Sequence, residues 1–130
     1  MDFKIPVKIE SERLVLRTFL SEDWKDMFEY YSDPECMKYT IGRTLTEGET
    51  WRTIASMVGH WQLRGYGPYA LHYKDENRVI GVCGMWFPID WPEPEIKWGL
   101  IRKYQGQGFA REAATRVKKM VKENWKKIQL

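Results

Sequence analysis

The sequence predicts one α/β or α+β layered domain spanning residues 1–130. Two observations predict this fold class: strand and helix patterns alternate along the chain, and short connections separate them. A length of 130 residues is enough for one hydrophobic core, and 43% hydrophobic with 30% charged residues is typical of a globular protein. No repeat or low-complexity segment interrupts the pattern.

The first half of the chain predicts one strand and two helices. Residues 13–19 alternate apolar and polar side chains, as a strand with one buried face does. Residues 21–33 begin with a favourable N-cap serine and carry an apolar stripe at helical spacing. Residues 46–49 form a capping box, which predicts a second helix that ends at residues 64–65. We expect the inner face of this second helix to contain Trp51, Ile54, Ala55, Val58 and Trp61.

The second half predicts an antiparallel strand pair, a further strand and a long final helix. Residues 69–73 and 79–87 form the pair, joined by a four-residue turn. A proline-rich loop follows, and a strand begins at Glu95. The final helix is expected over about residues 109–125. Its predicted inward side chains are Ala110, Ala113, Ala114, Val117, Met120, Val121 and Trp125.

The connection between the last strand and the last helix is rich in glycine. Gly106 and Gly108 have no Cβ, so the backbone here can adopt positive φ angles and come close to a ligand. Free N–H groups at the start of the helix, together with its dipole, favour phosphate oxygens. A mononucleotide P-loop would need Lys-Ser or Lys-Thr after the glycines, and the dinucleotide fingerprint would need glycine in place of Arg111. The alternative interpretation is a tight strand-to-helix connection without a ligand.

The loop matches the pattern Q-x-x-G-x-A and resembles the acetyl-CoA pyrophosphate loop of the GNAT superfamily of N-acetyltransferases. Further segments resemble the ribosomal-protein N-acetyltransferase branch of that superfamily, in the same order along the chain: residues 11–17, 21–23, 32–35 and 81–84. The resemblance implies a mixed, mostly antiparallel sheet flanked by helices. It also implies transfer of an acetyl group to a primary amine, either a protein N-terminus or a small molecule, with acetyl-CoA as co-substrate and no metal. The residues expected to contact the cofactor through this loop are Gln105, Gly106, Gln107, Gly108, Phe109 and Ala110.

The resemblance also assigns roles along the strand before the loop. Glu95 matches the residue that removes a proton from the attacking amine, and an exposed carboxylate at a strand end is the alternative. Main-chain groups of Gly99, Leu100 and Ile101 would pair with the pantetheine arm of the cofactor and stabilise the oxyanion.

Aromatic and acidic residues gather just before this strand. Trp86, Asp90 and Trp91 are candidates for a pocket that holds a cationic amine, since ring faces and carboxylates both favour positive charge. Packing beneath a proline-rich loop is the alternative interpretation.

The sequence departs from the pattern of these acetyltransferases at its C-terminal end. Relatives continue with a strand, a helix and a final strand, whereas this sequence ends at Leu130. We therefore expect an incomplete cofactor groove and a bare sheet edge, covered by a second copy in a homodimer. A non-catalytic module that binds CoA or serves assembly is the alternative to an active enzyme.

Charge and cysteine content favour no other partner class. The net charge is +3, and the basic residues of the final helix suit the CoA 3′-phosphate, an acidic partner or simple solvation. A nucleic-acid binder is the weakest hypothesis, because stacking rings are not interleaved with these charges. The sequence has no apolar run long enough to span a bilayer and no signal-peptide pattern, so we expect a cytoplasmic protein with Cys36 and Cys83 as free thiols.

Overall fold

The computed structural model describes residues 3–129; Met1, Asp2 and Leu130 lie outside the described residues. Five strands form one sheet in the order β1-β2-β3-β4-β5, and every neighbouring pair is antiparallel. The expected layered fold with a mostly antiparallel sheet is confirmed. The strands are β1 (Lys8–Glu10), β2 (Leu14–Arg17), β3 (Pro68–Tyr73), β4 (Arg78–Trp86) and β5 (Glu95–Leu100).

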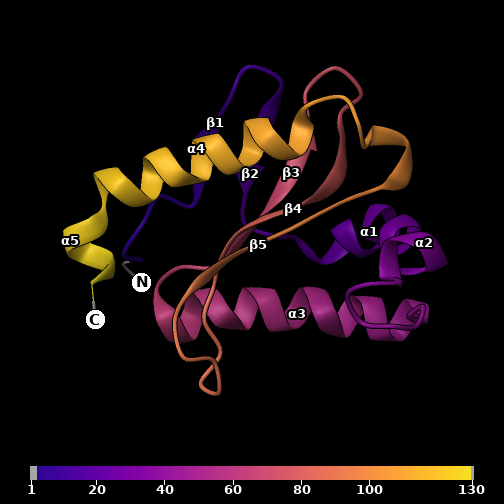
Figure 1. Ribbon diagram of the computed structural model, residues 1–130, viewed down its shortest axis with the longest axis horizontal. Coiled ribbons are helices and arrows are strands. Elements are labelled where there is room, and N and C mark those ends of the chain that lie inside the picture. Colours follow the sequence, from indigo (N-terminus) through magenta and orange to yellow (C-terminus); the bar gives the residue numbers. More distant parts are fainter. Residues whose placement is uncertain (1–2, 130) are drawn as a thin grey trace.

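Helices cover both faces of this sheet, as Figure 1 shows: α4 lies on one face, and α1 and α3 lie on the other. None of the helices within residues 3–129 is long and apolar enough to cross a lipid bilayer. The helices are η1 (Ser21–Asp23), α1 (Trp24–Tyr31), α2 (Pro34–Met37), α3 (Glu47–Arg64), η2 (Arg102–Tyr104), α4 (Phe109–Glu123) and α5 (Trp125–Ile128).

The interior strand β4, which lies between β3 and β5, is buried from Val79 to Met85, without the alternation of a half-exposed strand. The reason is that helices pack against both of its faces. By contrast, β2 alternates, with Leu14 and Leu16 fully buried and Val15 only half-buried. The register between β4 and β5 places Gly81 opposite Leu100 and Val82 opposite Gly99, and this close pairing positions β5 for the site described below.

The capping box predicted for the N-terminus of the long helix α3 is confirmed, and so is the glycine at its C-terminus. The Thr46 hydroxyl accepts a hydrogen bond from the Glu49 N–H, and the Glu49 carboxylate accepts one from the Thr46 N–H. Gly65 ends the helix in the left-handed region, with φ of 81°.

The expected inner face of α3 is partly wrong. Ile54 and Trp61 are buried, but the expected Trp51, Ala55 and Val58 are exposed. The buried stripe instead includes residues 50, 54, 57 and 61, whose spacing of four, three and four keeps one side of a helix facing the sheet. The neighbouring apolar stripe lies about 100° further round the helix axis and faces solvent.

The final helix is also shorter than expected. It stops at Glu123, because Asn124 leaves the helical conformation with φ of −115° and its side-chain amide donates to the Met120 carbonyl. A new helical turn, α5, follows. The change of direction leaves Trp125 about half exposed, so its predicted inward position is wrong.

Candidate functional site

The glycine loop between β5 and α4 adopts the left-handed backbone that the sequence indicated. Gly106 has φ of 78°, and Gly108 has φ of 85° at the N-cap of α4. A Cβ at Gly106 would meet no atom within 4 Å, so this residue faces open space. The loop is therefore shaped by its glycines and is accessible from outside.

The start of α4 presents free main-chain N–H groups. The first hydrogen bond of the helix is donated by Glu112 to the Gly108 carbonyl at 3.0 Å, and Gly108 has no side chain that could cap the turn. Within residues 3–129, the amides of Phe109, Ala110 and Arg111 donate to no carbonyl, as the first amides of a helix usually do. These amides and the helix dipole together favour an anion.

The two glutamines of the loop turn their side chains back to the main chain. The Gln105 side-chain amide donates to the Leu100 carbonyl at 3.0 Å, and that of Gln107 donates to the Lys103 carbonyl at 2.8 Å. Phe109 is buried and packs edge-on against Tyr73. These side chains fix the shape of the loop, and its main chain is what remains for a ligand.

Hydrogen bonds also connect the loop and the start of α4 to the N-terminal part of the chain. The Glu112 carboxylate accepts hydrogen bonds from the Ser11 hydroxyl, from the Arg13 N–H at 2.8 Å and from the Arg13 Nε at 2.7 Å. The Arg13 guanidinium also donates to the Gln107 carbonyl and stacks 3.9 Å above the centre of the Phe109 ring. Burial alone would raise the pKa of the Glu112 carboxyl, but these donors outweigh it and lower that pKa.

Replacing Glu112 with glutamine should lower the free energy of unfolding by about 2 kcal/mol, because the Arg13 guanidinium loses its charged partner. In the wild type this contribution is fully present above the ordinary glutamate pKa of about 4.3 and is lost as the pH falls through the lowered pKa of the folded state. Urea unfolding at pH 7 and pH 3 measures the free energy of unfolding of both proteins. The difference between the wild type and Glu112→Gln should be smaller at pH 3. The exposed Glu123→Gln is the control, expected to change stability by less than about 0.5 kcal/mol. An equal difference in free energy of unfolding at both pH values would contradict a stabilising role of the ionised Glu112 carboxylate.

The strand β5 is the edge of the sheet within the described residues, and its main chain alternates between two directions. The Ile101 amide donates to the Ile80 carbonyl at 2.9 Å, so it is occupied by β4. Because N–H groups of an antiparallel strand point alternately to either side, the amides of Trp98 and Leu100 point to the free edge. Of the three expected residues, only Leu100 thus has an amide available to a ligand, since those of Gly99 and Ile101 face β4.

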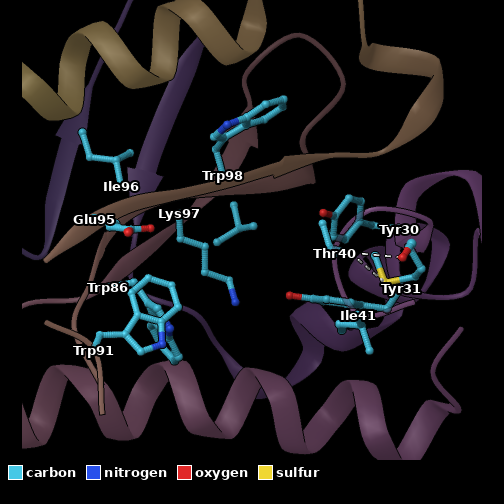
Figure 2. A pocket seen from close by; sticks show the side chains of 12 residues that line it. Tyr30, Tyr31, Thr40, Ile41, Trp86, Trp91, Glu95, Ile96, Lys97 and Trp98 are labelled. Carbon is cyan, nitrogen blue, oxygen red and sulfur yellow. Dashed lines mark hydrogen bonds between the residues drawn. The ribbon is translucent and has the colours of Figure 1, made fainter. Parts of the chain in front are cut away.

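A cavity of about 500 Å³ lies beside β5, on the face of the sheet that α1 covers. Glu95, Trp86 and Trp91, all expected from the sequence, line it together (Figure 2). Glu95 is exposed at the first position of β5. Asp90 is exposed as well and is not among the lining residues, so the structure does not bring it to this cavity. The other lining residues are Tyr30, Tyr31, Met37, Thr40, Ile41, Val82, Ile96, Lys97 and Trp98.

Tyr30 packs directly against β5, and a glycine makes this possible. A Cβ at Gly99 would lie 2.3 Å from the Tyr30 hydroxyl oxygen. Burial raises the pKa of Tyr30 to about 12, so its hydroxyl stays protonated at neutral pH. Gly99 therefore has a packing role in addition to its expected place in the cofactor groove.

His60 packs against Trp86, one of the tryptophans that line the cavity. The rings of His60 and Trp86 stack with centroids 4.7 Å apart. Nδ1 of His60 lies 2.8 Å from the Tyr66 carbonyl oxygen, and the Phe87 N–H donates to its Nε2 at 2.9 Å. Both nitrogens are thus occupied in the neutral ring, and burial lowers the pKa of His60. His60 positions Trp86 and is not itself a proton carrier for the cavity.

Similarity to known proteins identifies the family of this chain. The family described as acetyltransferase (GNAT) domain matches residues 13–129. This chain belongs to the GNAT acetyltransferase family. An uncharacterized N-acetyltransferase, p20, from Bacillus licheniformis is 32% identical over 109 residues, which cover 82% of this chain and 61% of that protein. The GNAT domain described here therefore spans about three fifths of the length of that curated relative.

Solved structures show the same GNAT fold. A GNAT-family acetyltransferase from Bacillus anthracis is 28% identical, with a TM-score of 0.77 over 92% of this chain and 68% of that one. An acetyltransferase from Agrobacterium tumefaciens is 25% identical, with a TM-score of 0.79 over 97% of this chain and 72% of that one.

Several cavity residues of this GNAT domain were not expected from the sequence. Tyr30 and Tyr31 lie on α1, and Tyr31 fits the apolar stripe of that helix, which predicts core packing. Lys97 lies within a strand, where a lysine usually indicates a solvent-facing position. Only the pairing of β5 with β4 beneath α1 brings these side chains to one cavity.

Proposed function

We propose that this chain is an acetyl-CoA-dependent N-acetyltransferase that moves the acetyl group to a primary amine. One observation supports this most strongly: the two ends of the same edge strand lead to complementary features. Leu100 ends β5 next to the glycine loop with its free amides, and Glu95 begins it beside the aromatic cavity. A cofactor bound along β5 would thus reach from the loop to the cavity.

In this proposal the pyrophosphate of the cofactor binds the amides of residues 106–111, and the pantetheine arm follows the free edge of β5. The outward amides of Trp98 and Leu100 would donate to the arm or to the carbonyl oxygen of the thioester. Sequence similarity to a GNAT family and a shared fold support the choice of cofactor. The microcin C7 self-immunity acetyltransferase, which shares the fold with a TM-score of 0.70 at 12% identity, was solved with acetyl-CoA and AMP.

The proposed chemistry is direct attack. The amine first loses a proton to Glu95, directly or through water. The nitrogen lone pair then forms a bond to the acetyl carbon, and the negative charge on the carbonyl oxygen is stabilised by an outward amide of β5. As the carbonyl re-forms, the carbon–sulfur bond breaks and CoA leaves as a thiolate. The nitrogen releases its second proton, and this proton neutralises the thiolate. The products are the N-acetylated amine and CoA.

The variant Glu95→Gln tests this function. It should lower kcat by about 100-fold, because a positioned base contributes at least that factor to proton transfer. Affinity for acetyl-CoA should stay within about twofold, since the loop lies at the other end of β5 and such a change is below 1 kcal/mol. Release of the CoA thiol with a panel of primary amines measures the first quantity, and calorimetry measures the second.

Glu93→Gln provides the matched control, because Glu93 is exposed two residues before Glu95 and does not line the cavity. Equal loss of activity in both variants would contradict the role of Glu95. Acetyl-CoA binding without turnover on any amine would favour the non-catalytic CoA-binding module instead.

A further inference from the structure

The aromatic cavity contains a cation that lacks a carboxylate partner. Lys97 extends from β5 into the space between the two tryptophans and the two tyrosines (Figure 2). Its ammonium lies 4.7 Å from the centre of the Trp86 ring, and no ion pair within residues 3–129 includes it. Burial lowers the pKa of Lys97, because the ammonium is less well solvated here than in water.

Tyr31 supplies a second donor on the opposite wall. Its side chain is 2% exposed, and its hydroxyl has no hydrogen-bond partner within residues 3–129. Figure 2 shows this hydroxyl pointing into the cavity toward the Lys97 side. Burial raises the pKa of Tyr31 far above its ordinary value, so the group is a protonated donor at neutral pH. A buried hydroxyl without a partner is costly unless a ligand accepts from it.

An ammonium and a hydroxyl that face one space from opposite walls are suited to bind a negatively charged group, which accepts a hydrogen bond from each of them. We propose that the cavity binds the carboxylate of an amino-acid-like acceptor, with Lys97 and Tyr31 as its hydrogen-bond donors. The proposal rests on the proposed acetyl transfer for the amine end of that acceptor.

The position of Glu95 gives the acceptor a direction. Glu95 and Lys97 are two residues apart on β5, so their side chains leave the same face about 7 Å from each other. An acceptor with an amine near Glu95 and a carboxylate near Lys97 therefore satisfies both charges. Trp86 and Trp91 then provide apolar walls for its side chain. A purely cationic acceptor, by contrast, would meet the Lys97 ammonium as a like charge.

Binding of 3-phenylpropionate tests the proposal, because this anion has a ring and a carboxylate but no amine to react. Its neutral counterpart is 3-phenylpropanamide. Titrations followed by tryptophan fluorescence should show that the wild type binds the anion at least about tenfold more tightly, as a charge-assisted hydrogen bond predicts. Lys97→Met should remove that preference, whereas the exposed Lys119→Met, with the same change in net charge, should retain it.

Tyr31→Phe gives an independent arm that does not depend on how Lys97→Met folds. It should weaken binding of the anion by about fivefold. The melting temperature should not fall, since the variant removes a hydroxyl that has no partner. Equal affinity of the wild type for the anion and the amide would overturn the proposal, as would an unchanged preference in Lys97→Met. The assay contains no acetyl-CoA, so its outcome is separate from that of the acetyl-transfer tests.

Discussion

Replacing Gly106 with glutamate is expected to weaken acetyl-CoA binding by about 100-fold, which corresponds to about 2.7 kcal/mol. A Cβ at this position would enter the open space beside the loop, where the cofactor phosphates are proposed to lie. The carboxylate would then repel the phosphates at the free amides of α4. Calorimetric titration of the variant and the wild type with acetyl-CoA measures the difference.

Gly42→Glu is a matched control for this change. Gly42 also has positive φ, at 86°, and a Cβ there would likewise meet nothing within 4 Å. Both variants thus carry the same backbone strain and the same added charge, and only one lies on the loop. Similar losses of acetyl-CoA affinity in the two variants would show that strain or net charge, and not the loop, causes the effect.

Replacing Gly81 with alanine should have the largest effect on stability. A Cβ at Gly81 would lie 2.2 Å from the Gly99 carbonyl oxygen and 2.9 Å from Cδ2 of Leu100. The backbone of β5 would have to move away from β4, since a carbonyl in a paired strand cannot rotate aside. We expect the free energy of unfolding to fall by about 3 kcal/mol and the melting temperature by about 10 °C.

Gly59→Ala is the opposite case in the same protein. Gly59 lies within α3, and a Cβ there would meet no atom within 4 Å. Alanine should therefore raise the free energy of unfolding by about 0.5–1 kcal/mol through better helix propensity. Thermal unfolding of both variants provides the comparison. A Gly81→Ala protein as stable as Gly59→Ala would contradict the close approach of β4 and β5.

Local signals in the sequence predicted much of the fold. The capping box of α3 and the glycine at its end depend on neighbouring residues only, and both are confirmed. The inner face of α3 was harder, because two apolar stripes lie side by side and only tertiary packing selects one. The three-residue strand β1 was not predicted, since so short a segment has no periodicity of its own.

The candidate site, like the fold, was predictable where local signals determine it and not where tertiary packing does. The loop around Gly106 and Gly108 was predictable, because positive φ angles require glycine at those positions. The cavity was predictable only in part, since Tyr31 and Lys97 are distant in sequence and meet through the pairing of β5 and the packing of α1. The homodimer stays a prediction, as do the roles of Glu95 and of the cofactor-binding residues.

We propose that the loop at the start of α4 and the edge of β5 form a cofactor groove. Calorimetric titration of this 130-residue chain with acetyl-CoA tests this most directly. We expect one binding site with a dissociation constant on the order of 10 μM. A folded chain, verified by circular dichroism, that shows no binding at acetyl-CoA concentrations up to about 1 mM would contradict it.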